Sequence, residues 1–171
     1  MAGHFSKIFW GLLVVILNIS IDGFDLLVDG VGYLLVAAGC NGLRYYSPRF
    51  ATARSLCLIL AILWLVGFAI PGELAMVWTL TSRAVDCAMI WFLLAGIGEW
   101  ALARQRPDLA RRASNRRIAY VAIMATTTIL GFALSGSRNA GPLAIVLVLS
   151  MLVLLVMILH LIHRAKIELV A

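Results

Sequence analysis

The chain has 171 residues, of which 63% are hydrophobic and 13% are charged, and its formal net charge is +6. A soluble globular domain carries charges on roughly a quarter of its residues. This composition therefore excludes an ordinary soluble protein and indicates that most of the surface faces lipid. The three cysteines, Cys40, Cys57 and Cys87, form no C-x-x-C pair and predict neither a disulfide framework nor a zinc site.

Six apolar stretches follow one another along the chain. A membrane helix needs about 20 apolar residues to cross a hydrocarbon core about 30 Å thick. Residues 55–70, 74–100, 118–134 and 142–162 meet or nearly meet this length, whereas residues 5–21 and 26–40 are shorter and predict a short hairpin. No stretch alternates as a membrane β-strand does, so all six are predicted helices. The predicted fold class is all-α, with residues 1–171 forming one six-helix transmembrane bundle.

Basic residues separate to one side of these spans. Cytoplasmic loops retain positive charge, so this side is predicted to be cytoplasmic, with both chain termini on it. The opposite side receives Arg138 and the acidic residues of the first hairpin, together with Glu73. The residues on the predicted cytoplasmic side are Lys7, Arg44, Arg49, Arg54, Arg104, Arg106, Arg111, Arg112, Arg116, Arg117, Arg164 and Lys166.

Arg83 and Asp86 place opposite charges inside the fourth span. Residues three apart share one helix face, and an isolated charge at this depth costs at least about 2.5 to 3.5 kcal/mol. We therefore expect the two side chains to face the bundle interior and neutralise each other. The pair predicts either a site for a substrate, proton or ion, or a structural contact that fixes helix packing. The nearby hydroxyls of Thr79, Thr81 and Ser82 could line the same cavity or bond to their own helix backbone.

A second polar cluster lies in the first hairpin, where Asp22, Asp25 and Asp29 follow Asn18. On a helix these carboxylates would share a face and could hold Mg²⁺ or Ca²⁺. Alternatively, they form a polar turn that caps the second helix. If the hairpin dips into the membrane, its carboxylates approach the level of Arg83, and the two polar clusters become one site.

The aspartate spacing resembles a magnesium- and diphosphate-binding motif of the membrane prenyltransferases related to ubiquinone biosynthesis. The chain has no second aspartate-rich motif, however, and is too short for that family. Its size is closer to the CDP-alcohol phosphotransferases, whose signature continues D-G-x-x-A-R. After Asp29-Gly30 this chain instead reads Val31-Gly32-Tyr33-Leu34. Both departures argue against these enzymes.

The first hairpin also resembles a family of small uncharacterised multi-pass bacterial membrane proteins. The residues that carry this resemblance are Lys7-Ile-Phe-Trp-Gly11 and Gly23-Phe-Asp25-Leu-Leu-Val-Asp29-Gly-Val-Gly32-Tyr33, with Val28 where the family has proline. The resemblance implies a multi-pass protein of the bacterial cytoplasmic membrane and brings no known activity with it.

The basic loop at residues 101–117 is the strongest local charge signal, carried by Arg104, Arg106, Arg111, Arg112, Arg116 and Arg117. Two roles are open for these arginines. They could contact anionic lipid headgroups, or they could serve only as the signal that orients the chain in the membrane. No aromatic or motif context suggests nucleic-acid binding, and no nucleotide or dinucleotide fingerprint predicts a cofactor. Small-residue faces at Gly39–Gly42 and Gly96–Gly98 predict close helix contacts, either within the bundle or with other membrane subunits.

The sequence leaves three functions open. The first is a small transport or ligand-binding subunit with its site at Arg83 and Asp86; in size and span number it resembles the substrate-capturing subunits of vitamin transporters. The second is a structural or assembly protein whose charges only pack the bundle. The third is a metal-assisted membrane transferase that uses Asp22, Asp25 and Asp29, although a non-enzymatic role is favoured.

Overall fold

The computed structural model describes residues 2–16, 28–67, 69–70, 72–133 and 140–170. Within them the chain forms six α-helices: α1 (Ala2–Ile16), α2 (Val28–Leu43), α3 (Pro48–Gly67), α4 (Ala75–Ala103), α5 (Pro107–Ala133) and α6 (Ala140–Val170). A short 3-10 helix, η1 (Gly72–Leu74), precedes α4. The all-α prediction is confirmed. Among the described residues, three helices are long and apolar enough to cross a membrane, over Pro48–Gly67, Ala75–Ala103 and Ile145–Leu169.

The helices extend beyond the predicted spans at the end of the bundle that holds both termini. The largest difference is the predicted basic loop at residues 101–117, because α4 continues to Ala103 and α5 already begins at Pro107. Most of that segment is therefore helix, and the prediction of a long loop was wrong. Proline is favoured at the first position of a helix, where its missing N–H costs nothing, and arginine is a good helix former.

The turn between α4 and α5 closes within three residues. Gln105 has a φ of 59°, which is the left-handed conformation that often follows a helix. The N–H of Arg106 donates to the carbonyl of Ala101 at 2.8 Å, and the N–H of Gln105 donates to that of Leu102 at 3.0 Å. These two bonds form a Schellman motif, which satisfies carbonyl groups that the end of α4 would otherwise leave free.

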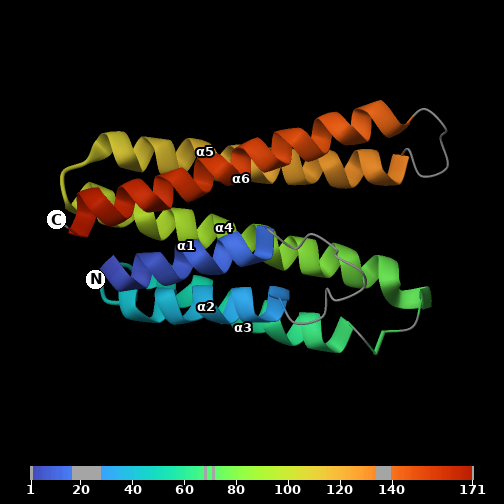
Figure 1. Cartoon of the computed structure of the whole chain (residues 1–171), viewed down its shortest axis with the longest axis horizontal. Helices are drawn as coiled ribbons and strands as arrows, with labels where there is room; N and C mark the ends of the chain where they lie inside the picture. The colour runs from blue at the N-terminus through green and yellow to red at the C-terminus, as the bar shows by residue number, and fades with distance from the viewer. Residues whose placement is uncertain (1, 17–27, 68, 71, 134–139, 171) are drawn as a thin grey trace.

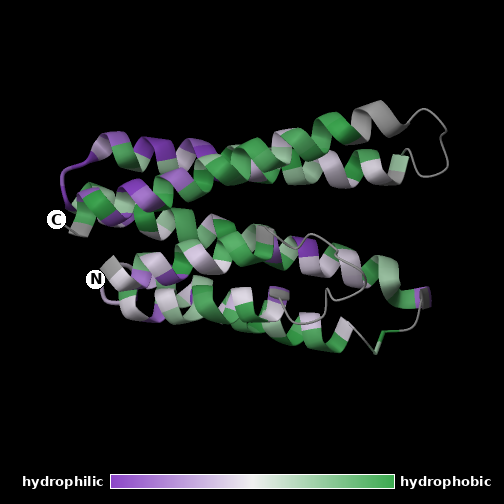
Figure 2. Cartoon of the chain, viewed as in Figure 1, coloured by the Kyte–Doolittle hydropathy of each residue, from purple (hydrophilic) through white to green (hydrophobic). Residues whose placement is uncertain are grey.

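The six helices form a closed ring. Each packs against its neighbour in chain order, and α6 returns to pack against α1. Consecutive helices run in opposite directions, so both termini lie at the same end of the bundle (Figure 1). Hydrophilic residues gather at this end, and hydrophobic residues cover most of the remaining length (Figure 2).

Glycines bring α1 and α2 into close contact. A Cβ atom on Gly11 would lie 2.7 Å from the carbonyl oxygen of Gly32, and one on Gly39 would lie 2.7 Å from that of His4. Because backbone atoms occupy this space, any side chain here would force the helices apart. The small-residue face at Gly39 therefore serves packing inside the chain. Gly96 does the same between α4 and α3, since its Cβ would lie 3.1 Å from the ring of Phe50.

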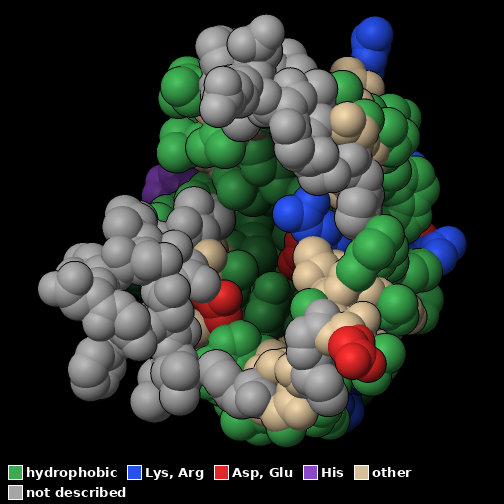
Figure 3. Space-filling view, turned by 90° about the vertical axis from the view of Figure 1, so that its right-hand side faces the viewer, with side chains coloured by type: hydrophobic (Ala, Val, Ile, Leu, Met, Phe, Trp, Pro, Cys, Tyr) green, Lys and Arg blue, Asp and Glu red, His purple; other side chains and the backbone are tan. Residues whose placement is uncertain are grey.

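Packing is dense at the terminal end of the bundle and loose at the other. Trp100 of α4 stacks on Phe5 at a ring-centroid distance of 5.5 Å and on Tyr46 at 4.5 Å. The same helix has buried residues only from Met89 onward, whereas Met76 and Val77 are mostly exposed. Figure 3 looks onto the loose end and shows a hollow bordered by hydrophobic, basic and acidic side chains. The interior of the ring is thus packed with side chains at the end that holds the termini and is hollow at the other end.

Candidate functional site

The carboxylate of Asp86 lies where the packed part of α4 gives way to the loose part. One of its oxygens accepts a hydrogen bond from the phenol of Tyr120, which is only 3% exposed and joins α5 to α4. No lysine, arginine or histidine among the described residues comes within ion-pair distance of Asp86. Asp86 is partly buried, and a carboxylate removed from water is costly unless it is paired or protonated. Asp86 therefore holds a hydroxyl donor but no compensating cation from the described part of the chain.

Arg83 does not neutralise Asp86, contrary to our expectation. Its guanidinium donates to the hydroxyl of Thr128 on α5 at 3.2 Å, and it lines a mostly apolar groove of about 270 Å³ between α4 and α5. Three residues along a helix place two Cβ atoms on one side, but the longer arginine side chain reaches a neighbouring helix instead. The two charges share a helix and have separate partners.

Two of the three hydroxyls before Arg83, those of Thr79 and Thr81, bond to their own helix. Thr79 donates to the carbonyl of Ala75 and Thr81 to that of Val77, each at 2.8 Å. Of the two roles that the sequence left open, the structure thus shows bonding to the helix backbone for Thr79 and Thr81. Their hydroxyl donors are therefore already used.

Residues of α2 approach Asp86 from across the ring. Asp29 and Tyr33 both lie close enough to Asp86 to interact with it electrostatically, and Tyr33 interacts in the same way with Tyr120. In the ring α3 stands between α2 and α4, so these groups meet in its interior. One carboxylate of the acidic hairpin is thus brought to the Asp86 region.

The remaining hairpin residues, Asn18, Asp22 and Asp25, lie outside the described part of the chain. The described residues contain no group of three or more histidine, cysteine or acidic side chains able to hold a metal. The predicted carboxylate face for Mg²⁺ or Ca²⁺ stays a prediction.

The six arginines predicted to meet lipid headgroups occupy different environments. Arg104, Arg106, Arg111 and Arg112 are exposed, whereas Arg116 and Arg117 are partly buried. Arg106 is ion-paired with Glu168, which also contacts Arg164 at 3.0 Å. Burial, followed by the like charges of Arg112 and Arg164, lowers the pKa of Arg116. Two of the six thus turn toward the bundle.

Sequence reasoning missed the tyrosines of this site. Tyr33 and Tyr120 are single aromatic residues in apolar helices, where the simplest prediction is packing. A tyrosine in a membrane span does carry a signal, because its hydroxyl needs a partner when it is buried. This predicts that the hydroxyl of Tyr120 has a hydrogen-bond partner, but it does not identify the partner as Asp86.

Comparison of the chain with known protein families, curated proteins and solved structures finds no match.

Proposed function

We propose that the chain is a small ligand-binding or transport subunit of a membrane, with a site for a proton or a small cation at Asp86. The observation that supports this most is the Asp86 carboxylate. It accepts a bond from Tyr120, forms no ion pair with a described lysine, arginine or histidine, and lies within electrostatic range of a second acid, Asp29. Two carboxylates near each other favour a bound proton or cation. Arg83, held by Thr128, forms part of the same polar region of α4.

The proposal includes six membrane crossings with both termini in the cytoplasm. The described lysines and arginines lie on the half of the bundle that holds the termini, apart from Arg83 within α4. Hydrophilic residues as a whole gather at the same end (Figure 2). The exposed apolar side chains of α3 and α6 suit contact with lipid, including Ile59, Ile62, Val148, Leu152 and Val156. The hollow in Figure 3 would then face away from the cytoplasm.

Cysteine labelling tests this orientation. A cysteine in place of Glu73 should react with a membrane-impermeant maleimide added outside intact cells, and a cysteine in place of Arg111 only after the membrane is opened. The unsubstituted protein, with Cys40 and Cys57 buried and Cys87 partly buried, gives the background. The reverse labelling pattern would show that the proposed orientation is inverted.

Thermal unfolding of the purified protein in detergent tests the site. Sodium, potassium, lithium and methylammonium chlorides are each compared with choline chloride at equal ionic strength, and pH is varied separately. A ligand present at about 100 times its Kd adds about 2.7 kcal/mol of stability. We expect one of the cations, or protons, to stabilise the wild type and Asp108→Asn, and to lose this effect in Asp86→Asn. Asp108 is the matched control, because it is an acid about half exposed at the opposite end.

The hydrogen bond between Asp86 and Tyr120 also favours the structural alternative, because it joins α4 to α5. In that case Asp86→Asn lowers the unfolding temperature, while no cation and no pH change has an effect that depends on Asp86. Labelling with the hydrophobic reagent dicyclohexylcarbodiimide separates the two functions further. A ligand site predicts labelling of Asp86 that the stabilising cation prevents.

A further inference from the structure

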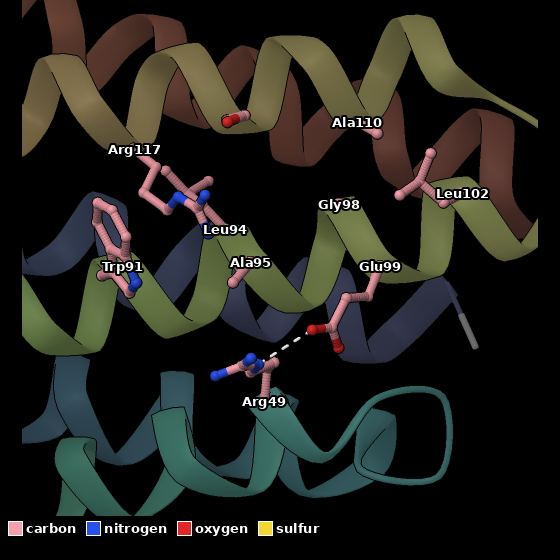
Figure 4. Close-up of a pocket in the computed structure, with 10 residues that line it drawn as sticks. Arg49, Trp91, Leu94, Ala95, Gly98, Glu99, Leu102, Ala110 and Arg117 are labelled. Carbon is pink, nitrogen blue, oxygen red and sulfur yellow. Dashed lines mark hydrogen bonds and ion pairs between the residues drawn. The ribbon is translucent and has the colours of Figure 1, made fainter.

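A separate cavity lies nearer than Asp86 to the end of the bundle that holds the termini. It has a volume of about 410 Å³ and is lined by residues of α3, α4 and α5, with Arg49 and Arg117 on either side of α4 (Figure 4). Glu99 supplies the acidic group in its wall, and Ser114 adds a hydroxyl. The site is independent of the proposed proton or cation site.

The two arginines differ in how their donors are used. The Nε of Arg49 donates to Glu99 at 3.0 Å, and the same carboxylate accepts a bond from Ser47, so the negative charge of Glu99 is already balanced. The guanidinium of Arg117 stacks over Trp91 at 4.1 Å from the ring centroid. Its Nε is buried and has no hydrogen-bond partner among the described residues. Arg117 lies within electrostatic range of Glu99 but forms no ion pair among the described residues, and it brings an unused donor to the cavity.

A buried guanidinium donor without an acceptor is unfavourable, and phosphate oxygens are well matched to it. With Glu99 balanced by Arg49, the charge of Arg117 leaves the cavity net positive. The terminal nitrogens of Arg49 take no part in its bond to Glu99, so they remain as donors at the α3 side of the cavity. The hydroxyl of Ser114 provides another donor.

The position of the cavity indicates that the anion belongs to a lipid. Arg117 is the last basic residue before the apolar part of α5, where Ile118 and Val121 are 57% and 37% exposed. Arg49 also lies near an aromatic ring, with its guanidinium carbon 5.7 Å from the centroid of Phe92. Aromatic and basic side chains together are typical of the headgroup level of a membrane. A phosphate in the cavity would leave acyl chains beside the exposed face of α5.

We propose that this cavity binds the phosphate of an anionic phospholipid, through Arg117 and Arg49. The sequence predicted that six arginines of residues 101–117 contact lipid headgroups. The proposal assigns specific binding of the headgroup phosphate to Arg117 alone among these six, and adds Arg49 from α3. The exposed arginines Arg104 and Arg111 keep only a general attraction to an anionic surface.

Native mass spectrometry of the detergent-purified protein, titrated with dioleoyl phosphatidylglycerol, tests the proposal. Arg117→Gln should weaken binding about fivefold to tenfold, whereas Arg111→Gln, with the same loss of charge on the same helix, should change it less than about twofold. Gly98→Leu fills the cavity without changing charge, and its first added carbon has room because the nearest atoms lie 3.8 Å away or more. It should weaken binding at least as much, and it keeps the test decisive if Arg117→Gln fails to fold.

Equal losses in Arg111→Gln and Arg117→Gln, or unchanged binding in Gly98→Leu, would show that the lipid is attracted by diffuse charge and would overturn the proposal. Equal binding of dioleoyl phosphatidylcholine would overturn the preference for an anionic lipid. Competition by sn-glycerol 1-phosphate at the affinity of the lipid would show that a soluble phosphate ester is the ligand, and would overturn the lipid assignment.

Discussion

Replacement of Gly39 by alanine should destabilise the bundle, although alanine is the better helix former. The new Cβ would lie 2.5 Å from the Cγ1 of Ile8 and 2.7 Å from the carbonyl oxygen of His4. Ile8 can change its rotamer, but the backbone oxygen cannot, so α1 and α2 must separate. Overpacking of this kind costs about 1 to 3 kcal/mol, and helix propensity offsets about 0.5 to 1 kcal/mol. The difference between these ranges is at most about 2.5 kcal/mol, and because the clash is with a backbone oxygen we expect a net loss of about 1 to 2 kcal/mol.

Thermal unfolding in detergent, followed by tryptophan fluorescence, measures this effect. For a chain of this length the expected loss corresponds to a fall of about 2 to 8 °C in Tm. Gly131→Ala on α5 is the matched control, because no heavy atom lies within 4 Å of its added Cβ. That change should leave Tm unchanged or raise it slightly. If Gly39→Ala and Gly131→Ala shift Tm in the same direction, the close contact between α1 and α2 is refuted.

Three further changes probe single contacts, each by unfolding in detergent. Tyr120→Phe removes the donor to Asp86 and should cost about 0.6 kcal/mol and at most about 1.7 kcal/mol, the average and maximum for hydrogen bonds between membrane helices; a similar cost when Asp86 is already alanine would contradict this origin. Arg49 and Glu99 are 47% and 43% exposed, so a double-mutant cycle with glutamine at both should give a coupling below about 1 kcal/mol that weakens with salt, and a salt-independent coupling would count against the exposed pair. Gln105→Gly should stabilise the chain by up to about 1 kcal/mol, because it relieves the left-handed φ of 59°; a loss would show that the glutamine side chain supports the turn.

Length and hydropathy predict the helical class and the order of the elements well. Pro48–Gly67, for example, is apolar enough to stand out in any window of its length. They fail at the basic ends, because arginine is excluded from lipid but not from a helix. The segment after Pro107 is thus polar and helical at once, and charge alone suggests a loop.

Side-chain partners on neighbouring helices are harder to predict from the sequence than the helices themselves. The tyrosine that bonds to Asp86 lies 34 positions away, and the threonine that bonds to Arg83 lies 45 positions away. Both pairs depend on the register in which α5 packs against α4, and the helical periodicity of the sequence does not define that register. A single sequence shows only local spacing, which pairs Arg83 with Asp86 three positions along the same helix.

The contact between α1 and α6 gives the ring a definite order of assembly. Phe9 of α1 packs near His163 of α6, with their ring centroids 6.3 Å apart. During synthesis the other neighbouring pairs can form as soon as the second helix of each pair emerges, but this one must wait for nearly the whole chain. Until then α1 lacks its α6 neighbour, and one of its sides stays uncovered. Premature termination anywhere before α6 would therefore leave an open arc of helices, and quality-control proteases could recognise the unpaired side of α1.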